Sequence, residues 1–512
     1  MTIIYGAKCI GIEAVPVTVE IDITSGIGIH LVGLADVAVK ESLLRTITAL
    51  QSMAFRIPGR KIVINLAPAD MHKKGSGYDV PIALGIISAS GQRQLPLLDK
   101  YLVMGELGLD GSVREIPGAI PTVELAAKAG FKGCILPRNS ALEAVDFQNI
   151  EVYGVDNLAQ VLDIMSGEVP CTQWLVENIY GEYEEEPSRT SFEGIPDFAE
   201  IIGQDCAKRG AEIAAAGGHN IILIGPPGSG KSSLAKAMAG ILPPMSLEES
   251  IQTSKIYSVS GRGNLTGGLI KSRPFRAPHY SASIAALIGG GSGSILPGEI
   301  SLAHNGILFL DEFCEAPKRT LEVLRGPMED RKVVISRLKS KIEFPSDFML
   351  VAAANPCPCG YYGEGERCTC TPAQRLSYLS RLSGPIMDRI DLQIWMHPIN
   401  PKLLVERKRS EPSEAVARRV LRAREIQKVR FSGTNVFCNA AMDNKMTETF
   451  CNLDKACSSL LEKIIERLGL SARACSRILK LSRTIADLEG SEDIKPDHIA
   501  EAAGYRFLDR QI

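Results

Sequence analysis

The sequence predicts a multidomain α/β protein with a helical C-terminal region, and three observations lead to this fold class. Short β-branched runs alternate with helix-like stretches through most of the chain. A glycine-rich phosphate-binding motif lies between an apolar strand and a helix. Residues 400–512 are rich in helix formers and show no clear strand pattern. With 512 residues, the chain is long enough for about two to four domains.

The first 175 residues are predicted to form a compact α/β domain. Its β-branched runs indicate strands and its helix-like runs indicate helices. The expected strands are 15–23, 61–66 and 133–136, and the expected helices are 38–53 and 122–129.

Residues 176–194 are acidic and poor in apolar side chains, with Glu184 to Glu186 followed by Pro187. This composition favours a linker, with a solvated helix end as the alternative. A second α/β domain is expected over 195–399, and a helical domain over 400–512.

The charge balance limits the kinds of partner. The chain has 57 Lys and Arg against 59 Asp and Glu, a formal charge of −2. This excludes a protein that coats nucleic acid through bulk positive charge, so any polyanion site must be local. Apolar runs are too short to cross a bilayer, and the N-terminus lacks the pattern of an export signal. We therefore expect a cytoplasmic protein without membrane contact.

The apolar strand 221–224 runs directly into Gly-Pro-Pro-Gly-Ser-Gly-Lys-Ser, and a helical sequence follows. Glycines let backbone N–H groups wrap phosphates, and the helix N-terminus favours negative charge. Lys231 is expected to reach the β- and γ-phosphates of ATP and Ser232 to bind Mg²⁺, whereas a chance match is the alternative. The expected nucleotide-binding residues are Gly225, Pro226, Pro227, Gly228, Ser229, Gly230, Lys231, Ser232, Ser233 and Asp311.

Polar residues also end two further predicted strands. An apolar run from Gly306 leads to Asp311 and Glu312, where Asp311 would hold Mg²⁺ through water and Glu312 would polarise the attacking water. A strand cap is the alternative for this pair. The run 348–354 ends in Asn355, which is placed to orient the lytic water between the other two strands.

Two arginines are candidates for stabilising the γ-phosphate during transfer. Arg389 lies in a short predicted helical turn, and Arg473 opens a helix in the C-terminal domain. They would act within one subunit or from a neighbouring one. On spacing alone, each is more often a surface residue.

Thirteen cysteines are scattered along the chain, and four of them cluster: Cys357, Cys359, Cys368 and Cys370. Four thiolates satisfy tetrahedral Zn²⁺ and leave no open position, so a bound zinc would be structural. The spacing is C-x-C instead of the commoner C-x₂-C, and free thiols or a redox pair are the alternatives.

Three basic segments are candidates for binding a polyanion. Between Ile251 and Gly298 there is no Asp or Glu, and the glycines there would give mobility for gripping phosphates. In the stretch 331–341, period-two alternation predicts three cations on one face of a hairpin arm. For any single cation, a solvated side chain is the simpler interpretation. The cations of these two segments are Lys255, Arg262, Lys271, Arg273 and Arg276, then Arg337, Lys339 and Lys341.

The third basic segment, 401–430, carries ten Lys or Arg and four Glu. Arg418, Arg422 and Glu425 are spaced to share a helical face. This face is expected to serve either DNA or a subunit junction.

Several sequence blocks resemble the YifB/ComM family of magnesium-chelatase-like AAA+ ATPases over essentially the whole chain. They are RPFRAPHYSAS, LRGPMEDRKVVISR, AAANPCPCG and SARACSRILKLSRTIADLEG. The resemblance implies a P-loop AAA+ α/β core with a C-terminal helical lid domain, and a segment that lines a central pore. It matches Lys231 and Ser232 to Walker A, Asp311 and Glu312 to Walker B, Asn355 to sensor 1, Arg389 to a trans-acting arginine finger and Arg473 to sensor 2.

The segment GLDGSVREIPGAIPTVELAAKAGFKGCILP resembles the proteolytic domain of Lon proteases, an S5 domain 2-like α/β fold. Lon chemistry needs a Ser nucleophile and a Lys base. By the resemblance, these positions fall on Gly77, one residue after Ser76, and on Pro121. Because neither residue supplies the required group, we predict a non-proteolytic Lon-like domain used for assembly or DNA contact.

The resemblance implies an ATP- and Mg²⁺-dependent homo-hexamer that moves on single-stranded or branched DNA. The ComM branch of the family promotes branch migration during integration of transforming DNA. The alternative is a protein-remodelling AAA+ ATPase, like the chelatase subunit, for which nucleic acid is irrelevant.

Overall fold

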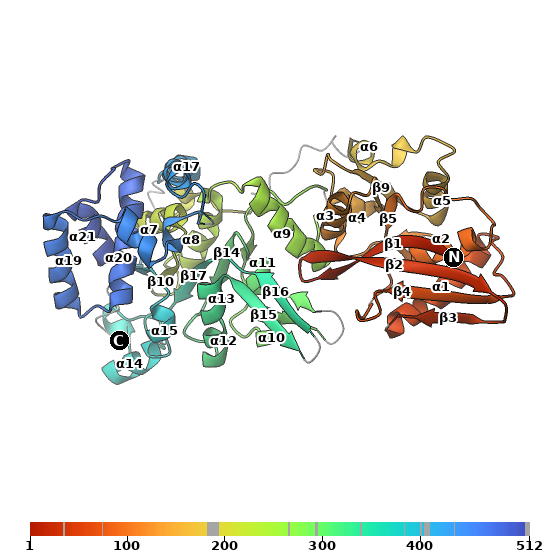
Figure 1. The fold of residues 1–512 in the computed structure, drawn as a ribbon. Helices are drawn as coiled ribbons and strands as arrows, with labels where there is room; N and C mark the ends of the chain where they lie inside the picture. Colours follow the sequence, from red (N-terminus) through yellow and green to blue (C-terminus); the bar gives the residue numbers. More distant parts are fainter. Residues whose placement is uncertain are drawn as a thin grey trace.

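The structure, a computed structural model, shows three parts in chain order (Figure 1). The N-terminal domain lies at one end, the central α/β core in the middle, and the C-terminal helices at the other end. The structure describes residues 1–33, 36–73, 75–181, 194–264, 267–291, 295–337, 340–382, 384–399, 402–403, 410–434 and 436–506.

The N-terminal domain is a seven-stranded sheet, in the order β3-β4-β2-β1-β5-β8-β9, covered on both faces. In β8, Ile135 faces one apolar layer, while Cys134 and Leu136 face the other, as expected for a pleated strand. Helices α1, α2 and α5 contribute to the first layer, and α3, α4 and α6 to the second. The predicted strands and helices of this domain are confirmed within a few residues. Its main elements are β1 (Thr2–Ile10), β2 (Glu13–Thr24), β3 (Ile29–Val32), α1 (Val37–Ser52), β4 (Lys61–Ala67), α2 (Asp79–Ala89), β5 (Tyr101–Val103), α3 (Ala119–Ala129), β8 (Gly133–Pro137), α4 (Arg138–Leu142), β9 (Glu151–Val155), α5 (Leu158–Ser166) and α6 (Val176–Gly181).

The predicted linker begins too early. Residues 176–181 form α6, which packs on α4 and β9. Val176 and Ile179 are both buried, because their spacing of three places them on one face of this short helix. The N-terminal domain therefore extends to residue 181, and the acidic Glu184 to Glu186 lie outside the described residues.

The core is built on a five-stranded parallel sheet in the order β11-β14-β17-β10-β18. Alternate residues of β10 bury on opposite faces, Ile221 and Leu223 on one and Ile222 and Ile224 on the other. Both faces are thus covered, as parallel sheets require. The elements are α7 (Asp205–Gly217), β10 (Ile221–Ile224), α8 (Lys231–Met238), α9 (Leu247–Val259), β11 (Phe275–Arg276), β14 (Ile307–Leu310), α13 (Arg325–Asp330), β15 (Lys332–Arg337), β16 (Ser340–Pro345), β17 (Met349–Ala354), α14 (Pro372–Leu379), α15 (Gly384–Met387) and β18 (Leu392–Trp395).

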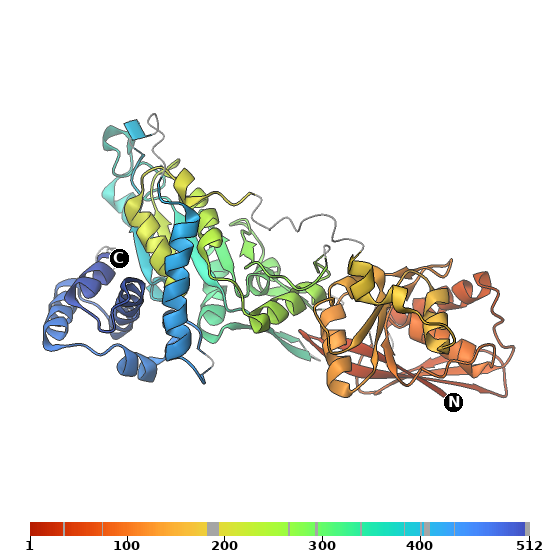
Figure 2. The ribbon, with the colours of Figure 1, turned by 90° about the horizontal axis from the view of Figure 1, so that it is seen from above.

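The C-terminal part is helical, as predicted, and shares one apolar core with the sheet. Val420 of α17 and Ile485 of α20 belong to the same buried cluster as Leu223 of β10. The long helix α17 runs along α7 (Figure 2). None of the described helices is long and apolar enough to cross a membrane. The helices are α17 (Ser413–Arg430), α18 (Asn444–Phe450), α19 (Lys455–Leu468), α20 (Ala472–Glu489) and α21 (Pro496–Gly504).

Helix α9 joins the core to the N-terminal domain. The buried Lys255 ammonium forms ion pairs with Glu13 at 2.6 Å and Glu124 at 2.7 Å, both from the N-terminal domain. The Gly118 N–H donates to the Ser258 carbonyl at 3.0 Å. The side chain of Glu143 is also buried near Ser258, and this burial raises the pKa of its carboxyl to about 7. The two domains are thus joined by polar contacts around the buried Lys255 and Ser258.

Candidate ATP-binding site

The phosphate-binding loop leaves β10 and enters α8, as the sequence predicts. Gly228 and Gly230 have φ values of 76° and 91°, in the left-handed region that glycine adopts without strain. Gly225 has no room for a side chain, because a Cβ there would lie 2.5 Å from the Met396 carbonyl oxygen. These three glycines let the loop turn tightly at the carboxyl end of β10.

Lys231 is the first residue of α8 and its ammonium is almost covered. Its Nζ donates to the carbonyls of Gly225 at 2.6 Å and Pro226 at 2.9 Å, and to Asn355 Oδ1 at 3.2 Å. Burial lowers the pKa of this ammonium, and Asp311 opposes the shift. An anionic phosphate at this position would favour the charged form in the same way.

The carboxyl ends of the parallel strands bring the other predicted residues to the same edge of the sheet. The Ser232 hydroxyl donates to Asp311 Oδ2 at 2.8 Å, the geometry expected of a pair that shares a Mg²⁺ ion. Strand β17 lies between β10 and β14, so Asn355 stands between Lys231 and Asp311, as predicted. Lys231 and Ser232 begin helix α8, whereas Asp311 and Asn355 follow the neighbouring strands β14 and β17.

Glu312 is exposed beside Asp311, and its N–H donates to Asp311 Oδ1 at 2.9 Å. Its φ of 49° is uncommon for a non-glycine residue, and such strain tends to occur at functional positions. Of the two remaining predicted serines, Ser229 is buried in the loop and Ser233 is exposed on α8.

Arg389 and Arg473 lie at the opposite edge of the sheet. Arg389 precedes β18, and both arginines line a cavity of about 480 Å³ with Asn220 and Met349, which border the amino ends of β10 and β17. A four-residue strand separates the two edges by about 13 Å. The structure therefore does not bring these arginines to the phosphate loop of their own chain.

The surroundings of the two arginines differ. Arg389 is nearly buried and forms an ion pair with Glu329 of α13. Arg473 follows the N-cap Ser471 of α20, is 70% exposed and lies 4.0 Å from Asp388.

Gln204 is a residue of the site that the sequence did not reveal. Its side-chain amide donates to the carbonyls of Ser229 at 3.1 Å and His397 at 2.6 Å, which ties the phosphate loop to the segment after β18. Gln204 also has a φ of 61°. The sequence offers only a lone Gln after a glycine, which is too common a pattern to select it.

The four predicted zinc ligands meet just beyond Asn355. Their Sγ atoms all lie within 4.8 Å of one another. Cys357 Sγ is 3.3 Å from Cys359 Sγ and 3.8 Å from Cys368 Sγ, and Cys359 and Cys368 are 3.7 Å apart. A tetrahedral Zn²⁺ with bonds of about 2.3 Å places its sulfurs about 3.8 Å apart. The cluster, completed by Cys370, therefore fits a tetrathiolate metal.

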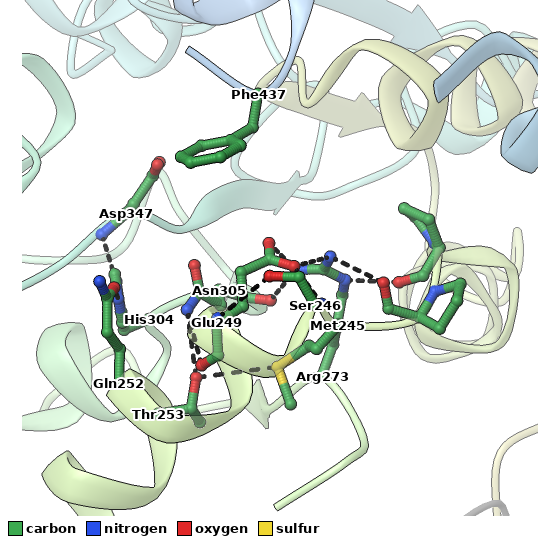
Figure 3. A network of polar contacts seen from close by, with 12 residues as sticks. Met245, Ser246, Glu249, Gln252, Thr253, Arg273, His304, Asn305, Asp347 and Phe437 are labelled. Carbon is green, nitrogen blue, oxygen red and sulfur yellow. Dashed lines mark hydrogen bonds and ion pairs between the residues drawn. The ribbon is translucent and has the colours of Figure 1, made fainter. Parts of the chain in front are cut away.

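Most cations of the first basic segment are not available to phosphates. Lys255 is buried at the domain junction, while Arg262 and Arg276 pair with Glu299. Arg273 is held by Glu249 at 3.0 Å and by three backbone carbonyls (Figure 3). Lys255, Arg273 and Arg276 are thus largely enclosed by their partners. Arg262 is 54% exposed, and Lys271, 3.6 Å from Asp146, is 79% exposed, so phosphate contact by this segment stays a prediction.

The predicted hairpin is present as β15 and β16, but its cations do not share one face. The register pairs position 337 with Ser340 and Ser336 with Lys341. Directly opposed residues share a face, so positions 337 and 341 belong to opposite faces. The period-two prediction fails for these two positions, because 337 belongs to β15 and 341 to β16, and the register between the strands sets their faces. Lys339 lies outside the described residues.

The third basic segment divides into anchored and exposed cations. Arg419 bonds Glu411 and Glu212, Arg424 bonds the Ala215 carbonyl, and Arg430 bonds Asp487. Arg418, Arg422 and Glu425 are exposed along one face of α17, as their spacing predicts. Arg407, Lys408 and Arg409 lie outside the described residues.

The positions of the Lon dyad carry no catalytic groups. At Gly77, a Cβ would lie 2.8 Å from Met104 Cε, and Pro121 is buried in α3. The neighbouring Ser76 hydroxyl donates to the Glu106 carboxylate, not to an amine.

Comparisons with known proteins agree with this architecture. The family described as "Magnesium chelatase, subunit ChlI" matches residues 197–404, "Subunit ChlI of Mg-chelatase" matches 19–140, and "Magnesium chelatase, subunit ChlI C-terminal" matches 410–506. A segment is also 25% identical over 150 residues to the archaeal Lon protease of Methanocaldococcus jannaschii, covering 29% of this chain and 23% of the protease.

Two relatives are similar over their full length. The competence protein ComM of Haemophilus influenzae is 41% identical over 519 residues, and YifB of Salmonella typhimurium is 40% identical over 514 residues. Each alignment covers 100% of this chain and 98% of the relative. AAA+ ATPases of this kind bind ATP with Mg²⁺ and hydrolyse it. The chain belongs to the YifB/ComM family of magnesium-chelatase-like AAA+ ATPases.

Proposed function

We propose that the protein is a ring-forming, ATP-driven DNA motor that acts on single-stranded or branched DNA. The observation that carries this proposal is the separation of Lys231 and Asp311 from Arg389 and Arg473, at opposite edges of one sheet. A hydrolytic site with all four groups then requires two neighbouring copies, as in a closed ring such as a hexamer. The name of the competence protein ComM supports DNA uptake and integration as the process served.

In this proposal each side chain at the carboxyl edge has one task. Lys231 binds the β- and γ-phosphates, Ser232 and Asp311 hold Mg²⁺, Glu312 activates water, and Asn355 orients that water. The neighbour's Arg389 and Arg473 stabilise the charge that develops on the γ-phosphate. To do so, Arg389 exchanges its ion pair with Glu329 for one with phosphate.

DNA contact is assigned to the exposed cations that remain. Among the described residues they include Lys271 before β11, Lys341 on the hairpin, and Arg418 and Arg422 on α17. The first three lie 3.6, 3.7 and 3.3 Å from Asp146, Glu343 and Glu414, in exposed ion pairs that contribute little and that a phosphate can replace. Each is a single charge, so tight binding depends on repetition around a ring and falls with added salt. A motor that acts on DNA in a bacterial relative of this kind is expected in the cytoplasm, and we propose that location for this protein.

ATP hydrolysis tests the proposal when it is measured without DNA, with single-stranded DNA and with branched DNA. DNA is expected to raise the rate, and Lys231→Ala to lower it by about 100-fold or more, because the phosphates lose their cation. Lys236→Ala removes an exposed cation of the same helix and is the matched control. Branch migration and strand displacement should depend on Lys231 in the same way.

A second candidate function is ATP-driven remodelling of a protein partner. The observation that favours it is the internal pairing of Lys255, Arg273 and Arg276, which leaves fewer cations for DNA in the described part of the segment 251–298. An ATPase rate that ignores both kinds of DNA but rises with a protein partner would replace the DNA motor with this function.

We also propose that the Lon-like domain does not cleave peptides. The nucleophile position has no side chain at Gly77, and Pro121 has no amine to act as base. Incubation with unfolded protein and ATP is expected to give no fragments by mass spectrometry. Cleavage that disappears in Ser76→Ala would contradict this assignment.

We further propose that Cys357, Cys359, Cys368 and Cys370 bind one structural zinc ion. The sulfur separations match a tetrathiolate, and four protein ligands leave no position for catalysis. Metal analysis of the purified protein is expected to give about one zinc per chain. A substoichiometric zinc content, with folding unchanged by a chelator, would contradict the zinc site.

A further inference from the structure

The four-cysteine loop, residues 357–370, begins beside the candidate nucleotide site. Cys357 is two residues beyond Asn355, is fully buried, and follows the carboxyl end of β17. Asn355 in turn accepts a hydrogen bond from Lys231 Nζ at 3.2 Å. A metal that fixes Cys357 therefore fixes the backbone two residues from a side chain that contacts the phosphate-binding lysine.

The loop also packs directly on the phosphate loop. Gly360 lies between the second and third cysteines, with a φ of 86°. A Cβ at Gly360 would lie 3.0 Å from Pro227 Cδ and 4.0 Å from Asn355 Cγ. The buried Gly360 thus faces Pro227 of the phosphate loop with no room to spare for a methyl group, and the Asn355 side chain borders the same space.

The loop also contacts the end of β18 through Tyr362. The Tyr362 ring meets Trp395 edge-on, with centroids 6.1 Å apart, and the Arg375 guanidinium covers Tyr362 at 3.9 Å. Trp395 ends β18 and pairs with Ile224, the residue just before the phosphate loop. The loop therefore spans three strand ends around the nucleotide.

The loop has little regular structure to hold this position. Among its described residues, the regular element between Asn355 and α14 is one short 3₁₀ turn, Gly365–Arg367. A tetrathiolate metal would supply the missing cross-link, since metal binding and local folding share one free energy.

We propose that metal occupancy of the four-cysteine site sets the affinity of this protein for nucleotide, by pressing the loop at Gly360 against Pro227 and Asn355. The inference rests on the ATP and zinc sites proposed above. Linkage makes the effect reciprocal: if zinc tightens nucleotide binding by a given factor, nucleotide tightens zinc binding by the same factor.

The experiment measures both halves of this linkage on the full chain. The dissociation constant of a fluorescent, non-hydrolysable ATP analogue is measured with Mg²⁺ before and after zinc removal by a chelator, and again after zinc is added back. Removal is expected to raise the constant by about tenfold and addition to restore it. In competition with a chromogenic chelator, the analogue should raise zinc affinity by the same factor.

Three outcomes of this experiment distinguish which of the proposals is wrong. Absence of zinc from the purified protein, with no uptake of added zinc, overturns both the zinc site and this inference. Zinc-loaded protein that does not bind the analogue overturns the ATP site. Equal analogue affinity with and without zinc, in protein that binds both, overturns the coupling alone.

A pair of glycine variants tests the contact without removing a ligand. Gly360→Ala places a Cβ against Pro227, whereas Gly365→Ala has a similar left-handed backbone, with φ of 62°, and open space around it. Both should retain zinc, and Gly360→Ala should weaken analogue binding more than Gly365→Ala. Thermal unfolding of both variants controls for the backbone strain they share. Equal effects on analogue binding would overturn the proposed contact.

Discussion

Replacing Glu312 by Gln is expected to lower ATP hydrolysis by about 100-fold or more while ATP binding is kept. The amide has the shape of the carboxylate but cannot accept the proton of the attacking water. Binding is expected to be retained because Lys231, Ser232 and Asp311, the proposed ligands of the phosphates and Mg²⁺, are unchanged. Phosphate release gives the rate, and equilibrium binding of a non-hydrolysable analogue gives the affinity.

The matched control for this variant is Glu315→Gln. Glu315 is an exposed carboxylate three residues further on, and it pairs with Arg381 at 3.1 Å. Its replacement should leave hydrolysis close to the wild-type rate. If Glu312→Gln retained full activity, another group would have to activate the water.

Replacing Arg389 by Ala is expected to lower ATP hydrolysis by about 1,000-fold, and this loss should be repaired by a neighbouring subunit. The Lys231→Ala and Arg389→Ala proteins, each inactive alone, are mixed in equal amounts. In randomly assembled rings, about one quarter of the junctions then join an intact Lys231 to an intact Arg389. Activity should reappear on mixing, because the arginine lies at the far edge of its own sheet.

An arginine that acts within its own chain gives the opposite result. The Lys231→Ala protein keeps Arg389 but has no functional phosphate site in the same chain. The Arg389→Ala protein keeps the phosphate site but lacks the arginine. Mixing would then restore nothing. Arg467→Ala, which removes an exposed arginine of α19, controls for unspecific effects of lost charge.

The sequence was sufficient to predict the nucleotide edge of the core. Strand β10 has the predicted bounds, and Lys231, Asp311 and Asn355 meet as their strand-end positions require. Parallel strands make this possible, since residues that follow such strands share one edge of the sheet. The residues far from this edge were harder to place.

The first basic segment, 251–298, shows why residues far from this edge are harder to place from the sequence. Lys255 is neutralised by Glu13 and Glu124, which are more than a hundred residues away in the chain and meet it only through domain packing. Residues 251–298 themselves contain no carboxylate, so this stretch suggests free charge. Glu249 and Glu299 lie just outside it, and they pair with Arg273 and Arg276 only because the fold brings them together. For Gln204, the informative feature is a hydrogen bond to a backbone carbonyl, which no side-chain pattern encodes.

The attachment of α9 has a mechanical consequence. This helix has 13 residues, about 20 Å, with its N-cap Ser246 beside the amino edge of the catalytic sheet and its far half bound to the N-terminal domain. The helix is therefore a rigid connection that is anchored in both domains. In the proposed ring, a tilt of one ATPase core relative to the next would carry the attached N-terminal domain with it, and the outer end of that domain would move through the longer arc.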